Sequence, residues 1–383
     1  MNWQTVRLGE VLRPSTDRIA LLPDTSYKQV TAKLWGKGLT LRGEVAGAEI
    51  AASHQNRVRE GQFVISKIDA RHGAFGVVPP DLDGAVVSND FPVFDVQPDR
   101  ALTHYVAWVS RTDWFVALCK QASEGSTNRV RLKETRFLAQ KIPLPPLPDQ
   151  RRIVARLDAV AAAIGARRER AAAAEAEITA ALAAGFARIT ARAPRAPMGD
   201  VAPLVRRPVT IDPDATYPEL GARSFGRGLF AKPDVIGAEV TWQSLYRIEA
   251  GDLIFSNIKA WEGAFAVAGA EHAGKHGSHR YLTCVPDPYR ATAGYLWYYL
   301  QSEDGMRRIN EASPGSADRN RTLATKRLAA IEVPVPPLDA QRWFDTLLAK
   351  AQAARKAQAD AAAELAALLP AMLNETFGTD ACA

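Results

Sequence analysis

The stretch Pro143-Leu-Pro-Pro-Leu147, followed by Gln150-Arg151, decides the fold because it occurs twice in the chain. Its second copy is Pro334-Val-Pro-Pro-Leu338, followed by Gln341-Arg342. Each copy stands before a long segment dominated by Ala, Arg, Glu and Leu, which are strong helix formers. Prolines forbid helix inside the stretch itself. The sequence therefore predicts two long helices, each entered through an extended, proline-rich lead-in.

The repeat extends far beyond this stretch. A shift of 190 residues aligns 27–140 with 217–330 without a gap, with 33 identities in 114 positions. One inserted residue then moves the offset to 191, and the register persists through the helices, pairing Leu182 with Leu373 and Phe186 with Phe377. Such a duplication predicts the order globule, helix, globule, helix. The predicted boundaries are 1–147, 148–192, 193–338 and 339–383.

Each globule has the sequence pattern of an α/β domain. Short apolar runs entered through a glycine, at 62–66 and 252–256, predict buried strands. The runs at 73–78 and 263–268 predict strands next to them. Aromatic and aliphatic residues at helical spacing predict helices over 102–120 and 292–310.

The two alanine-rich segments, 150–189 and 341–377, each carry one apolar stripe. A helix of about 40 residues is about 60 Å long and cannot bury such a stripe alone. We therefore expect the helices to pair as an antiparallel coiled coil, so that the molecule has pseudo-two-fold symmetry; two independent, exposed linkers are the alternative. Asp149 and Asp339 are candidate N-caps, and Pro370 is expected to kink the second helix or end it early.

Composition sets wider bounds on function. The net charge of +6 and the pI near 9.2 are compatible with a polyanionic partner without requiring one. Three widely spaced cysteines, Cys119, Cys284 and Cys382, predict neither a disulfide framework nor a zinc knuckle. The first residues lack the apolar core of a signal peptide, and no apolar run is long enough to cross a bilayer. We expect a cytoplasmic protein without a membrane partner.

The order of these motifs resembles the specificity subunits of Type I restriction–modification systems. The resemblance covers essentially the whole chain and is carried by Gly125-Ser-Thr-Asn-Arg-Val-Arg-Leu-Lys133, by Ile142 to Val154 with the alanine-rich helix, and by Gly61 to Arg71, all repeated downstream. It implies two target-recognition domains, each reading half of an asymmetric bipartite site in double-stranded DNA. The second copy departs from the pattern at Gly315-Ser-Ala-Asp-Arg-Asn-Arg321, which weakens a transfer of loop contacts but not of the family.

The resemblance also implies partners. The paired helices act as a spacer and dock methyltransferase subunits, two of them, and a restriction subunit can join. S-adenosylmethionine and ATP belong to those partners, so this chain is expected to hold no cofactor, no metal and no catalytic residue. The docking candidates are the apolar residues of the two stripes: Ile153, Leu157, Ile164, Leu182, Phe186, Phe344, Leu348, Leu369, Leu373 and Phe377.

Three segments of each copy are candidate DNA contacts. The glycine-serine loop mixes small donors with cations, as phosphate-binding segments do; a turn packed on the helix is the alternative. Cations interleaved with an aromatic between glycines suit groove or backbone contact; a solvated turn is the alternative. If the strand continues past Ser66, alternate polar residues share a face, although an ordinary solvated face is favoured there. In this order the candidates are Ser126, Thr127, Asn128, Arg129, Arg131, Lys133, Ser316, Arg319 and Arg321; Lys33, Trp35, Lys37, Arg223, Phe225 and Arg227; and Lys67, Arg71, Asn257 and Lys259.

Other functions remain open at this point. A glycine-lysine segment at 269–276 has the spacing of a phosphate loop but ends in His276 instead of Ser or Thr. A stand-alone nuclease or methyltransferase is disfavoured because its motifs are missing. The alternatives that remain are a recognition module of another DNA-modifying or phage-defence complex and a coiled-coil adaptor that binds only protein.

Overall fold

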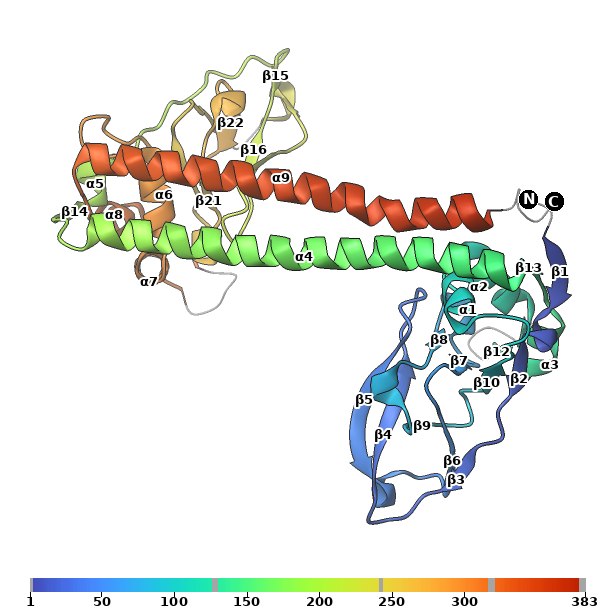
Figure 1. Ribbon diagram of the computed structural model, residues 1–383. Helices are drawn as coiled ribbons and strands as arrows, with labels where there is room; N and C mark the ends of the chain where they lie inside the picture. Colours follow the sequence, from blue (N-terminus) through green and yellow to red (C-terminus); the bar gives the residue numbers. More distant parts are fainter. Residues whose placement is uncertain (1–2, 126–129, 241–243, 316–320, 379–383) are drawn as a thin grey trace. The chain divides into compact units, whose positions relative to one another are not determined.

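The computed structural model describes residues 3–125, 130–240, 244–315 and 321–378 (Figure 1). The chain divides into two compact units. Unit 1 comprises residues 1–170 and 359–383, and unit 2 comprises residues 171–358. Each unit therefore contains one globule, the first half of one long helix and the second half of the other.

Unit 1 contains four small sheets. A two-stranded sheet pairs β1 (Gln4–Arg7) with β13 (Lys141–Leu144), and a short hairpin pairs β11 (Ser123–Glu124) with β12 (Arg131–Leu132). A four-stranded sheet has the order β2 (Leu12–Pro14), β10 (Val93–Val96), β7 (Phe63–Ile65), β8 (Phe75–Val77). A five-stranded sheet has the order β3 (Arg18–Ala20), β6 (His54–Arg57), β9 (Val86–Val87), β4 (Ser26–Ala32), β5 (Leu39–Ala46).

Unit 2 repeats this plan with shorter strands. Its central sheet has the order β21 (Phe265–Val267), β20 (Leu253–Ser256), β23 (Tyr281–Cys284). The remaining strands form four pairs: β14 (Arg195–Pro197) with β24 (Glu332–Pro334), β15 (Thr216–Tyr217) with β18 (Val235–Ile236), β16 (Leu220–Ala222) with β17 (Leu229–Ala231), and β19 (Leu245–Arg247) with β22 (His276–Ser278). The strands predicted at 62–66 and 73–78, and their copies, are confirmed as antiparallel neighbours.

The helices predicted over 102–120 and 292–310 are confirmed, and each range is divided into two helices. In unit 1 they are α1 (Thr103–Val109) and α2 (Asp113–Gln121), and in unit 2 α6 (Ala293–Gln301) and α7 (Glu303–Glu311). A hydroxyl residue starts the second helix of each pair. Thr112 Oγ1 accepts from the Phe115 N–H, and Ser302 Oγ accepts from the Gly305 N–H. An N-cap within an apolar run therefore breaks a periodicity that otherwise continues.

Shorter helices complete both units. The α-helices are α3 (Glu134–Ala139), α5 (Met198–Val201) and α8 (Thr325–Ala329). The 3-10 helices are η1 (Leu8–Glu10), η2 (Gly47–Glu49), η3 (Ala70–His72), η4 (Pro80–Leu82), η6 (Gly237–Glu239), η7 (Ala260–Glu262) and η8 (Ala270–His272).

The two long helices are confirmed as α4 (Leu147–Thr190) and α9 (Leu338–Phe377), green and red in Figure 1. Both begin earlier than predicted, so Asp149 and Asp339 lie in the first turn and are not N-caps. The prediction that Pro370 ends the second helix is also wrong, because α9 continues through it to Phe377.

The halves of α4 and α9 that meet inside unit 2 run antiparallel. Arg355 of α9 forms a forked ion pair with Glu175 of α4, with its Nη2 2.7 Å from Glu175 Oε1. Further along, Gly185 of α4 faces Trp343 and Leu347 of α9. Residue numbers rise on one helix as they fall on the other, which confirms the predicted direction of pairing.

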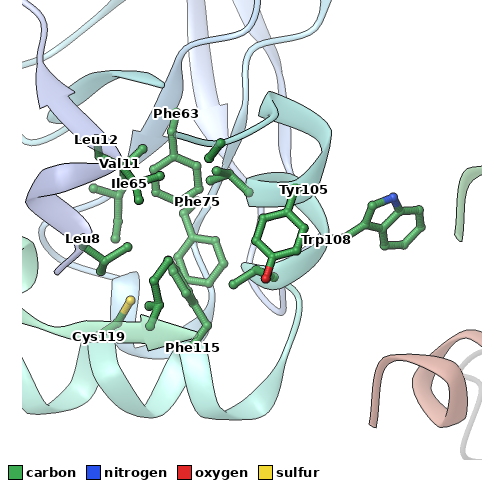
Figure 2. Packing of buried hydrophobic residues seen from close by; sticks show 14 of the residues in the cluster. Leu8, Val11, Leu12, Phe63, Ile65, Phe75, Tyr105, Trp108, Phe115 and Cys119 are labelled. Carbon is green, nitrogen blue, oxygen red and sulfur yellow. The ribbon is translucent and has the colours of Figure 1, made fainter. Parts of the chain in front are cut away.

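The long helices complete the hydrophobic core of each unit. In unit 1, Phe115 packs edge to face against both Phe63 and Phe75, beside Tyr105 (Figure 2). Phe377 of α9 packs against the Tyr105 ring at 5.7 Å. In unit 2, the repeat-equivalent Phe186 of α4 packs against Tyr295 at 5.6 Å.

This packing corrects the prediction for the apolar stripes. Leu157, Ile164, Leu182, Phe344, Leu348, Leu373 and Phe377 are buried within the chain, and Ile153, Phe186 and Leu369 pack against the same cores. These side chains hold the helices to each other and to the globules. They do not present a surface to a partner, because a stripe that is apolar in sequence reports only that it is buried, not against what.

Among the described residues, no helix combines the length and the apolar character needed to cross a membrane.

Candidate nucleic-acid interface

One turn occurs in both units at equivalent positions and brings together the cation–aromatic segments. In unit 1 residues 33–38 connect β4 to β5, and in unit 2 residues 223–228 connect β16 to β17. Each turn is closed by a backbone hydrogen bond of 2.9 Å, from the Lys33 N–H to the Gly38 carbonyl and from the Arg223 N–H to the Gly228 carbonyl. We call them the aromatic turns.

The aromatic residue of each turn has an unusual backbone. The φ angle is 65° at Trp35 and 61° at Phe225. Every other residue with positive φ in the described parts of the chain is a glycine. L-residues with a Cβ are strained in this region. Both rings are nevertheless 71% exposed, so their own packing does not explain the strain.

Backbone hydrogen bonds attach each aromatic turn to the end of a 3-10 helix, η3 in unit 1 and η7 in unit 2. The Trp35 N–H donates to the His72 carbonyl at 2.7 Å, and the Gly36 N–H donates to the Gly73 carbonyl at 2.9 Å. In unit 2 the Phe225 N–H donates to the Glu262 carbonyl at 2.8 Å, and the Gly226 N–H to the Gly263 carbonyl at 3.0 Å. Sequence reasoning missed these supports, although the repeated Gly-Ala-Phe at 73–75 and 263–265 marks their place.

Glycines allow this close approach. A Cβ on Gly73 would lie 2.7 Å from the Gly36 nitrogen, and one on Gly76 would lie 2.8 Å from the Gly38 Cα. Gly73 also has a φ of 78°, which favours glycine. The turn of unit 1 is thus fixed by contacts that leave no room for a side chain.

Two exposed cations flank each ring. They are Lys33 and Lys37 in unit 1, and Arg223 and Arg227 in unit 2. The Arg227 guanidinium lies 5.7 Å from the centre of the Phe225 ring. A ring between cations can stack on a base while the cations meet phosphates, and neither turn contains an acidic residue. Unit 2 also has a hollow of about 650 Å³ beside its turn, lined in part by Arg227, Trp297 and Asp345.

The strand does not continue past Ser66, which was the condition for the third set of candidates to share a face. β7 ends at Ile65, and the Ser66 carbonyl then accepts from the Ala70 N–H at 3.0 Å while its hydroxyl accepts from the Asp69 N–H at 3.1 Å. The chain enters a 3-10 helix in both units, at η3 and η7. The alternate residues therefore share no face, because the serine gives the backbone a local partner in place of the ladder.

The candidates of that segment are engaged within the protein. Lys67 lies 2.7 Å from Glu134, and Lys259 lies 2.6 Å from Glu262. The Arg71 Nε donates to His72 at 3.1 Å. The Asn257 carbonyl accepts a hydrogen bond from the Leu323 N–H at 2.7 Å. The structure gives these residues local contacts, and the partners of Lys259 and Arg71, namely Glu262 and His72, are the residues that support the aromatic turns.

Most of the glycine-serine loop falls outside the described residues, namely Ser126, Thr127, Asn128, Arg129, Ser316 and Arg319. Of the rest, Lys133 is exposed and Arg131 pairs with Asp90 at 2.8 Å. The Arg321 guanidinium donates to Asn310 Oδ1 at 2.7 Å and lies over the Trp261 ring. Arg321 therefore ties its own loop to α7.

Comparison with known proteins agrees with this architecture. The profile of the family described as "Type I restriction modification DNA specificity domain" matches residues 1–175. No curated protein sequence matches the chain. A solved HsdS subunit from Thermoanaerobacter tengcongensis is similar, with 22% identity, a TM-score of 0.58 and coverage of 99% of this chain and 97% of that one.

A second solved structure is described as "Structural basis underlying complex assembly and conformational transition of the type I R-M system". It has 22% identity and a TM-score of 0.64, and covers 99% of this chain and 98% of its own. At this identity the two structures show a shared fold. Residues 1–175 match the model of the Type I restriction–modification DNA specificity domain, and the second half of the chain repeats the same structural plan.

Proposed function

We propose that this chain is the DNA-recognition subunit of a Type I restriction–modification complex, with each unit reading one half of a bipartite site. The observation that carries the proposal is the recurrence of the aromatic turn, exposed and flanked by cations, in both units of a chain whose first half matches a DNA specificity domain. The turns differ in detail, with Lys, Trp and Lys in one and Arg, Phe and Arg in the other. Two similar but unequal readers in one chain suit an asymmetric site.

We further propose that the chain itself performs no catalysis and holds no cofactor. Methyl transfer with S-adenosylmethionine, and any ATP-driven cleavage, would belong to two methyltransferase subunits and a restriction subunit. The described part of the chain contains no cluster of three or more His, Cys, Asp or Glu side chains suited to a metal ion.

Methyltransferase docking would use side chains other than the buried stripes. Trp343 of α9 is 42% exposed, and the Arg188 guanidinium of α4 lies 4.2 Å from its ring centre. Trp and Arg are the residues most enriched among interface hot spots. We expect Trp343→Ala to weaken methyltransferase association by about tenfold or more, measured by titration calorimetry, with the melting temperature little changed. Exposed Thr346→Ala on the same helix is the matched control.

Mapping of modified bases in the host genome, with and without this gene, tests the proposal. Loss of methylation at one asymmetric bipartite motif on deletion is the expected result. If deletion changes no methylation, and the purified complex binds all duplexes equally across a salt series, the protein-only adaptor replaces the DNA reader.

A further inference from the structure

We infer that Trp35 and Phe225 each stack an aromatic ring on DNA, one ring in each half-site, and that the strained backbone at these positions serves to hold the ring outward. The inference rests on the proposed function. It goes beyond it by naming the contacting side chains and the kind of contact they make.

The positive φ at Trp35 and Phe225 costs the folded protein free energy. A residue with a Cβ is less stable in the left-handed region than glycine is. The chain uses glycine at every other positive-φ position that the structure describes. At two equivalent positions it keeps a large ring instead. Strain of this kind persists where it serves function.

Neither ring contributes to a hydrophobic core of the protein. Trp35 and Phe225 are 71% exposed, and neither belongs to a hydrophobic core of its unit. The turns are attached by backbone hydrogen bonds, which any residue at these positions could form. Stability therefore gives no reason for an aromatic side chain at either position.

The aromatic turn of unit 1 is held rigidly in place. The turn of unit 1 is bonded to the carbonyls of His72 and Gly73, and the missing side chains of Gly73 and Gly76 allow direct backbone contact. The Trp35 ring also meets the His72 ring edge to face at 6.2 Å. A ring held in place before binding loses little conformational entropy when a ligand stacks on it.

Charge favours DNA over protein as the occupant. In the sequence each ring residue lies between two exposed cations, Lys33 and Lys37 or Arg223 and Arg227; the Arg227 guanidinium lies near the Phe225 ring, whereas that of Arg223 lies over Phe230. The carboxylate of Glu262, which supports the second turn, is engaged by Lys259 at 2.6 Å and by the Ser224 hydroxyl at 2.8 Å. In double-stranded DNA a ring meets a base face by wedging into a base step, a contact that does not require one particular base, so these rings would anchor each reader while other side chains select the sequence.

The test uses the full chain purified from its host with the subunits bound to it. The probe is a duplex carrying the motif that genome methylation mapping gives, and a scrambled duplex is the reference. Trp35→Ala and Phe225→Ala should each weaken specific binding about ten- to hundredfold, measured by fluorescence anisotropy, whereas Trp35→Phe should retain most of it. Tyr289→Ala removes an aromatic ring that is 87% exposed and lies outside both turns, and should change nothing.

Each outcome has one meaning. If wild type binds its motif and both alanine variants bind equally well, the stacking role is wrong while the proposed function stands. If the alanine variants lose bound methyltransferase instead of DNA affinity, the rings contact protein and the inference is overturned. If wild type does not distinguish motif from scrambled duplex, the proposed function fails and the inference fails with it. Melting temperatures of all variants within a few degrees of wild type are required for a supporting result.

Discussion

At the scale of single residues, substitutions of Trp35 can change the stability of the protein and its binding separately. With φ at 65°, an alanine keeps the strain and a glycine relieves it. We expect Trp35→Gly to be more stable than Trp35→Ala by about 0.5–1 kcal/mol in urea unfolding, even though both lack the ring. Gly43 on β5 has no positive φ and open space around it, so Gly43→Ala should show no such effect. An alanine variant as stable as the glycine variant would contradict the strain.

Asp304 of α7 makes a pH-dependent contribution to the stability of unit 2. Burial by itself raises the pKa of this carboxyl, but hydrogen bonds from Arg195, Tyr299, Arg308 and Arg307 outweigh it and hold the pKa well below its ordinary value of 3.8. Because the pKa of Asp304 is lower in the folded state than in the unfolded state, the carboxylate stabilises the fold above about pH 4. This stabilisation is lost as the pH falls below that value.

We expect Asp304→Asn to lower the free energy of unfolding by about 1–2 kcal/mol at pH 7, a modest figure because a third of the side chain is exposed. The difference from wild type should shrink below about pH 4, because the Asp304 carboxyl of the unfolded chain is protonated there and folding must release that proton. Melting curves of both proteins between pH 3 and 7 measure this. A constant difference across that range would mean that the charge of Asp304 is not what stabilises the network.

At the scale of elements, a buried glutamine joins each long helix to its globule. Gln150 Oε1 accepts from the Leu102 N–H at 2.8 Å, and its Nε2 donates to the carbonyls of Arg100 and Pro145. Gln341 makes the same three bonds, with Thr292, Arg290 and Pro336. Both glutamines are fully buried. The repeated Gln-Arg after the proline stretch is thus a structural junction.

Gln150→Leu is expected to destabilise unit 1 by about 2–4 kcal/mol, because it leaves three buried backbone groups without partners. Denaturant unfolding followed by circular dichroism measures the loss. The neighbouring Arg151 is exposed, so Arg151→Ala should stay within about 0.5 kcal/mol of wild type. Equal behaviour of the two variants would show that water replaces the lost bonds.

The elements also show which features are readable from sequence. Repeats, long helices and the strands at 62–66 and 73–78 have strong periodic patterns, and they were predicted. The break at Thr112 and the turn after Ser66 depend on single hydroxyls that compete with the regular backbone pattern. The aromatic turns were predicted as candidate contacts from composition, but the φ of Trp35 depends on a tertiary contact with the end of η3, which no local pattern encodes.

At the scale of the whole molecule, the first globule needs a segment from far along the chain, whereas the second is completed by the helix segments next to it in sequence. The core of unit 1 contains Met372, Leu373 and Phe377 of α9, and the Trp114 Nε1–H donates to the Phe377 carbonyl at 2.9 Å. A fragment comprising residues 1–190 lacks that segment. It does contain the repeat equivalents of Leu373 and Phe377, namely Leu182 and Phe186, on its own α4.

We expect the fragment 1–190 to form a dimer in which α4 of each copy completes the core of the other. Light scattering after gel filtration measures the mass. Leu182→Asp in the fragment should yield an unstable monomer, because a carboxylate cannot enter that core. A stable, folded monomer of the unmodified fragment would mean that unit 1 does not need a second helix.

The contact between Trp114 and Phe377 also sets the order of events during synthesis. The first globule leaves the ribosome early, but the side chains that complete its core emerge only after about 200 further residues have been added, a delay of about 10–40 s at ordinary elongation rates. During that interval its apolar surface stays open to water and to other nascent chains. The part of the protein that is made first is therefore the part finished last, and protection by a chaperone would matter most there.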